Sequence, residues 1–119
     1  MLDDRAGMSK AHLALIRLLP CAVCKIYGNV QAHHLMIKEH RGIGMKAPDM
    51  FAIPLCDSCH HRLHTRGGRA HTETLRDEGV DDLRLASDLW GESMRTQSYT
   101  GRLNAMRSIV MLHEAGAGT

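Results

Sequence analysis

The 119 residues suffice for one domain, since domains commonly run to about 100–150 residues, and we expect residues 1–119 to form it. Hydrophobic residues make up 44% of the chain but aromatic residues only 3%, which predicts a thin core. No stretch approaches the roughly 18 consecutive apolar residues of a membrane helix, so we expect no membrane association and a cytoplasmic location. The net charge is +2, and residues 25–70 carry seven basic against three acidic side chains, a surplus found in phosphate-binding segments and on ordinary solvated surfaces.

The first predicted elements are a short helix and two strands. Residues 9–19 have the pattern of a helix, with Ser9 as its N-cap and Pro20 as its stop. Residues 29–35 follow a Gly-Asn turn and have the character of a strand, as do residues 51–55. The loop between these strands is rich in glycine and basic residues.

A helix is expected directly after the second strand. It covers residues 58–64, with Asp57 as its cap and Gly67 and Gly68 closing it. The order of strand, loop, strand and helix indicates an α+β fold. The remainder, about residues 72–114, is expected to be a helical extension with segments at 72–78, 83–94 and 102–114.

The last helical segment is amphipathic. Its apolar residues are expected to face inward: Leu103, Met106, Ile109, Val110 and Leu112. Packing on the core is the usual role of such a stripe, and a homodimer contact or a protein partner is the alternative.

Two Cys-x-x-Cys pairs, separated by 31 residues, are the strongest signal in the chain. They comprise Cys21, Cys24, Cys56 and Cys59. Because the cytosol keeps thiols reduced, a shared tetrahedral Zn²⁺ ion is favoured over a redox pair or unrelated buried thiols. Such a site is closed, so it is structural, and it can supply folding free energy on the order of 10 kcal/mol to a chain with a thin core.

Histidines form a second predicted cluster. His60 and His64 lie one turn apart on the predicted helix and can share one divalent ion, with His61 as an alternative to His60. His33 and His34 point to opposite faces of a strand, so one can bind the metal while the other takes a proton. The other histidines are expected to be solvated or structural: His12, His40, His71 and His113.

These motifs resemble the HNH nucleases of the His-Me finger (ββα-metal) superfamily. The resemblance covers residues 21–68 and includes Ala32-His33-His34 and the segment from Pro54 to His64. It is nearest to small HNH proteins of phages and prophages, including recombination-associated ones. It implies a zinc-braced ββα-metal core with flanking N- and C-terminal helices, in a bacterial or phage-infected cell.

The resemblance implies a role for each matching residue. His34 matches the general base that activates water, and His33, His60 and His64 match ligands of a catalytic Mg²⁺, Mn²⁺, Ni²⁺ or Zn²⁺ ion. The family's middle Asn would fall at Phe51, which is a departure from the pattern. We take Asp49, two residues earlier, as the substitute acceptor at the Asn position.

The implied reaction is hydrolysis of a DNA phosphodiester, with the metal stabilising the leaving 3′ oxygen. Backbone phosphates would be contacted by basic residues flanking the site, namely Lys38, Arg41, Lys46, Arg62, Arg66 and Arg69. Besides DNA, a recombination or packaging protein is a candidate partner. The alternative function is a noncatalytic zinc-ribbon DNA-binding or adaptor module with a degenerate HNH site.

Overall fold

The structure is a computed structural model that describes residues 7–35, 48–65, 71–96 and 98–114. Within these residues the chain forms five α-helices, one short 3-10 helix and a two-stranded antiparallel sheet. This confirms the predicted α+β class. None of the described helices combines the length and the apolar character that crossing a bilayer requires.

Helix α1 (Lys10–Ile16) begins where the sequence predicts, because the Ser9 hydroxyl accepts a hydrogen bond from the His12 N–H at 3.1 Å. It ends three residues earlier than predicted. The N–H groups of Leu18 and Leu19 bond to carbonyls only three residues back. This tightening ends the α-helix before Pro20, whose ring disfavours helical backbone in the residue that precedes it.

The sheet pairs β1 (Val30–His34) with β2 (Ala52–Cys56), and Val30 lies opposite Cys56 while His34 lies opposite Ala52. The predicted Gly-Asn turn leads into β1, with positive φ angles of 102° at Gly28 and 53° at Asn29. A 3-10 helix, η2 (Asp49–Phe51), comes immediately before β2, so this strand starts one residue later than predicted.

Helix α2 (Asp57–His64) follows β2 without a loop. Its N-cap is Cys56, and the prediction of Asp57 at that position is wrong. The Asp57 carboxylate instead accepts a hydrogen bond from the Gln31 side chain at 2.7 Å, which ties the start of the helix to β1. The glycines expected to close the helix lie outside the described residues.

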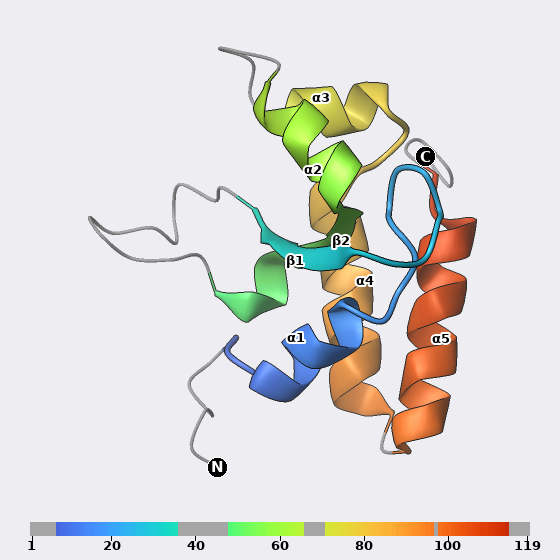
Figure 1. Ribbon diagram of the computed structural model, residues 1–119. Coiled ribbons are helices and arrows are strands. Elements are labelled where there is room, and N and C mark those ends of the chain that lie inside the picture. Colours follow the sequence, from blue (N-terminus) through green and yellow to red (C-terminus); the bar gives the residue numbers. More distant parts are fainter. Residues whose placement is uncertain (1–6, 36–47, 66–70, 97, 115–119) are drawn as a thin grey trace.

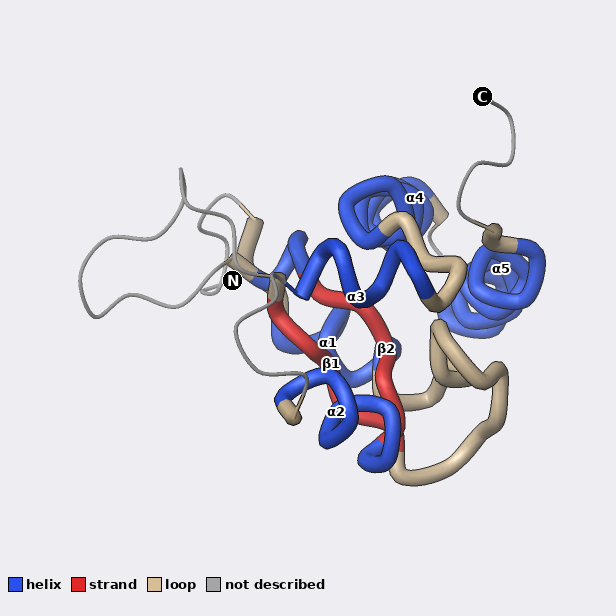
Figure 2. Tube along the Cα trace, turned by 90° about the horizontal axis from the view of Figure 1, so that it is seen from above, coloured by secondary structure: helices blue, strands red, loops and turns tan. Residues whose placement is uncertain are grey.

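Three helices complete the chain: α3 (His71–Asp77), α4 (Asp82–Arg95) and α5 (Tyr99–Leu112). Figure 1 shows the hairpin in the middle of the molecule, with α2 and α3 above it and α1 below. Helix α4 contacts both η2 and β2 and also packs along α5. The view from above in Figure 2 also places α5 beside α4, at the edge of the molecule.

The hydrophobic core lies around β2, in which Ala52, Ile53, Pro54 and Leu55 are all buried. Leucines from the surrounding helices fill it, including Leu15 of α1, Leu63 of α2 and Leu89 of α4. In α5 the predicted inward residues Met106 and Val110 are buried and Leu103 and Ile109 are half-buried, but Leu112 is 78% exposed. Leu112 follows Val110 by two positions, about 200° further round the helix, so it faces away from the core.

Replacing Leu89 with alanine is expected to lower the free energy of unfolding by about 2–5 kcal/mol, because Leu89 has no exposed surface and its removal leaves a cavity. Urea unfolding of the zinc-loaded protein measures this change. Leu83→Ala is the control on the same helix, since Leu83 is 49% exposed and its truncation should cost well under half as much. Equal losses for the two variants would contradict this description of the core.

Candidate metal centres

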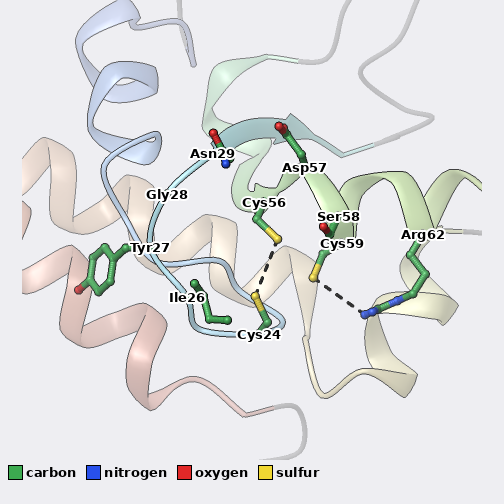
Figure 3. A pocket seen from close by; sticks show the side chains of 10 residues that line it. All are labelled: Cys24, Ile26, Tyr27, Gly28, Asn29, Cys56, Asp57, Ser58, Cys59 and Arg62. Carbon is green, nitrogen blue, oxygen red and sulfur yellow. Dashed lines mark hydrogen bonds between the residues drawn. The ribbon is translucent and has the colours of Figure 1, made fainter.

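The four cysteines come together from three parts of the fold. Cys21 and Cys24 lie in the loop after α1, Cys56 ends β2, and Cys59 lies in the first turn of α2. All four sulfur atoms lie within 4.8 Å of one another, and Cys24 Sγ is 3.8 Å from Cys56 Sγ (Figure 3). Four thiolates at 2.3 Å from one tetrahedral ion stand about 3.8 Å apart, whereas disulfide sulfurs stand about 2.05 Å apart. The cluster therefore suits a structural metal such as zinc.

The surroundings of the cluster change the pKa values of its thiols. Burial opposes ionisation of Cys21, but backbone N–H groups, including that of Val23 at 3.4 Å from Cys21 Sγ, outweigh it and lower the pKa of this thiol. Burial raises the pKa of Cys59, and the neighbouring Cys56 thiol raises it further. Burial and the thiol neighbours likewise raise the pKa of Cys24, and a bound divalent ion would favour the thiolate forms.

Two cationic side chains join the cysteine cluster to the helices. Arg62 Nη2 lies 3.9 Å from Cys59 Sγ and donates to Glu78 Oε1 at 2.9 Å. Lys25 adopts a positive φ of 63° after the first pair and donates from Nζ to the Val110 carbonyl at 2.7 Å, at the C-terminal end of α5. A cation in this position interacts favourably with the helix dipole. Lys25 thus fastens the metal-binding loop to the C-terminal helix.

A second cluster forms where β1 meets α2. His33 of β1 and His60 and His64 of α2 each offer one ligand atom, and these atoms lie within 4.8 Å of one another. The Nε2 atoms of His60 and His64 are 3.2 Å apart. Two nitrogens at 2.0–2.1 Å from a tetrahedral ion stand about 3.3 Å apart, so this pair has the spacing that one ion requires.

His33 is in the protonation state that metal binding requires. Burial first, and then the nearby imidazoles of His60, His71, His64 and His34, lower its pKa from 6.5 to about 3, so the ring is neutral at physiological pH. Its Nε2 atom is buried and finds no hydrogen-bond partner among the described atoms. A buried nitrogen without a partner costs about 1–3 kcal/mol, and a divalent ion would satisfy it.

His34 points to the other face of β1, as the alternation of a strand predicts. Its Nε2 atom lies 3.0 Å from Oδ1 of Asp49, a residue only 7% exposed. Asp49 Oδ2 accepts a second hydrogen bond from the Ser9 N–H at 2.9 Å, which connects η2 to the start of α1. The imidazole of His34 is therefore held in place by a buried carboxylate that is itself fixed by the backbone.

The other predicted site residues lie in the core, beside the cysteine cluster or outside the described residues. Phe51, at the Asn position of the HNH pattern, packs partly buried against the core, and its carbonyl accepts from the Leu35 N–H at 2.8 Å. Arg62 lies beside the cysteine cluster and is paired with Glu78. The remaining candidate phosphate contacts fall outside the described residues: Lys38, Arg41, Lys46, Arg66 and Arg69.

The other histidines differ from one another. His61 is exposed on α2 and lies outside the histidine cluster. His12 is fully buried with its ring edge-on to Trp90, and His113 Nε2 accepts a hydrogen bond from the Asp81 N–H at 3.0 Å, so both are structural. His71, by contrast, lies beside His33 and His64. Sequence spacing does not mark His71, because Gly67 and Gly68 separate it from the segment that carries His60 and His64. His40 lies outside the described residues.

Comparison with known proteins places the chain in a family. Residues 4–73 match the sequence profile of DUF968, described as a protein of unknown function. The chain belongs to the DUF968 family. The segment of this DUF968 protein that matches the profile contains both candidate metal clusters and ends within α3, whereas α4 and α5 lie beyond it.

The DUF968 protein also resembles the uncharacterized protein YdfU of Escherichia coli (strain K12). The two are 34% identical over 61 residues, which is 51% of this chain. The chain spans only 17% of the length of that relative. No solved structure matches the chain.

Proposed function

We propose that this protein is a metal-dependent HNH endonuclease that hydrolyses DNA phosphodiester bonds. The observation that carries the proposal is the meeting of His33 from a strand with His60 and His64 from the helix that directly follows its partner strand. Together with the adjacent His34 and the cysteine cluster at the other end of β2, this arrangement supports the resemblance to HNH nucleases, from which Phe51 at the Asn position departs.

His34 acts as the general base. Because the Asp49 carboxylate can only accept, His34 Nε2 carries the proton in this hydrogen bond, and Nδ1 keeps a lone pair that can take a proton from water. Asp49 fixes the ring and its tautomer, and it stabilises the positive charge that the imidazole gains with the proton. Asp49 is thus a positioning residue for the base.

His33, His60 and His64 would hold the divalent ion of this site. When bound, the ion supplies positive charge to the scissile phosphate and the leaving 3′ oxygen, which would leave a 5′ phosphate on the product. The three imidazoles fit this task because imidazole nitrogen is a common ligand of such ions and three ligands would leave positions on the ion open. DNA would then be held through phosphate contacts from the basic residues of segment 25–70.

The second candidate function is a noncatalytic zinc module that contacts DNA or a protein. It is favoured by Phe51, which stands where the HNH pattern has Asn and whose side chain packs against the core. In this case the histidines of α2 would not be needed for the function of the protein.

Two single-residue variants of helix α2 test the proposal. His64→Ala removes a ligand of the cluster, and we expect it to lower DNA cleavage at least about 100-fold and to weaken binding of a second divalent ion. His61→Ala changes an exposed ring outside the cluster and should retain the parent's cleavage rate. Supercoiled plasmid is the substrate, and zinc content is measured for both variants. Equal rates for the two variants would contradict the nuclease proposal.

A further inference from the structure

His71 stands at the edge of the histidine cluster although it belongs to another helix. It is the first residue of α3, which packs against α2. Its ring centroid lies 4.8 Å from that of His64, with the rings nearly perpendicular at 88°, and 5.8 Å from that of His33. Two residues of the cluster therefore touch His71 from different elements.

The ring of His71 has a nitrogen atom that is available to bind a metal ion. Its Nδ1 atom is buried and has no hydrogen-bond partner among the described atoms, as is also true of His33 Nε2. Two buried nitrogens without partners in one cluster point to a common cation rather than to a hydrogen bond between them.

We propose that His71 is the fourth protein ligand of the ion held by His33, His60 and His64. This inference rests on the metal site of the proposed function and extends it beyond the ββα segment. The ligand atoms of His33, His60 and His64 already lie within 4.8 Å of one another. His71 lies outside this group, so its ring would have to move closer to bind the same ion.

Four imidazoles change the chemistry that the site favours. Imidazole nitrogen suits Zn²⁺, Ni²⁺ and Co²⁺, whereas Mg²⁺ prefers oxygen ligands and retains several waters. The resident ion is therefore a transition metal. Four imidazoles would leave fewer open positions on the ion than three, and His71 would be the ligand at the edge of the cluster.

Cobalt titration of the full chain, with zinc already in the cysteine site, tests this inference. The parent should bind one additional Co²⁺ ion. His71→Ala and His71→Asn should lower its affinity at least about 100-fold, more than the roughly tenfold to 100-fold of an outer-shell partner, and should shift the visible d–d absorption. His61→Ala should match the parent in both respects. Zinc content and circular dichroism establish that each variant is folded.

The outcomes separate this inference from the nuclease proposal. If the folded His71→Asn variant keeps the Co²⁺ affinity and the d–d spectrum of the parent, His71 is not a ligand. This holds even if His64→Ala abolishes binding. Weaker Co²⁺ binding with a shifted d–d absorption in the His71 variants supports the fourth ligand even if the parent cuts no DNA. If the parent binds no second ion, the four-histidine site is rejected.

Discussion

Replacing His34 with alanine is expected to lower the rate of DNA cleavage by about 100-fold to 10,000-fold, because the variant has no group in that position to take a proton from water. The cysteine cluster and the three histidine ligands do not include His34, so the variant should keep its structural zinc and bind the second ion as the parent does. Single-turnover cleavage of supercoiled plasmid, with metal content measured on the same samples, checks both parts of this expectation.

Asp49→Asn is the companion of the His34 variant. The amide keeps the size of the carboxylate but can no longer stabilise the charge of the protonated ring, so we expect a smaller rate loss than for His34→Ala and a changed dependence of the rate on pH. A merely structural role for Asp49 would lower stability without altering that pH profile. Full cleavage activity in the His34→Ala variant would show that His34 is not the general base.

Replacing Cys59 with serine is expected to unfold most of the chain at 25 °C. Cys59 is 6% exposed and supplies one of the four clustered sulfurs. Binding of Zn²⁺ in structural sites contributes about 10–16 kcal/mol at neutral pH, which is comparable to the total stability of a typical domain, about 5–15 kcal/mol. Amide chemical-shift dispersion and zinc content measured together would detect the loss.

Ser58→Ala is the matched control for the cysteine variant, since it changes the exposed neighbour of Cys59 on the same helix and should leave zinc content and fold unchanged. Chelation of the metal from the parent should reproduce the unfolding, and added Zn²⁺ should reverse it. A Cys59→Ser variant that keeps the folded spectrum with no bound metal would show that the core alone stabilises the fold.

Short-range spacing was the part of the candidate site that could be predicted from the sequence. Histidines four apart on a helix share a face, and neighbouring residues on a strand face opposite ways, so His60, His64, His33 and His34 could be placed without coordinates. The cysteine pairs were predicted as one cluster because two Cys-x-x-Cys pairs in a reduced compartment favour a shared ion. Within each pair the spacing is local, and a shared ion is the reason for expecting the separate pairs to meet.

Contacts between distant residues could not be predicted. Asp49 was expected to act as a substitute acceptor at the Asn position, but its contact with His34 spans 15 residues and depends on the 3-10 helix that precedes β2. His71 reaches the cluster only because α3 packs against α2. The exposure of Leu112 likewise depends on which face of α5 meets α4, which apolar composition alone does not determine.

The most direct test of the nuclease proposal is nicking of supercoiled plasmid by the parent protein with zinc in its cysteine site only. Cleavage should be absent with a chelator of free metal and should appear when at least one of Ni²⁺, Mn²⁺, Mg²⁺ and further Zn²⁺ is added, leaving 5′ phosphate ends. A folded, zinc-loaded protein that cuts neither supercoiled, linear nor single-stranded DNA with any of these ions would contradict the proposal and favour a noncatalytic zinc module.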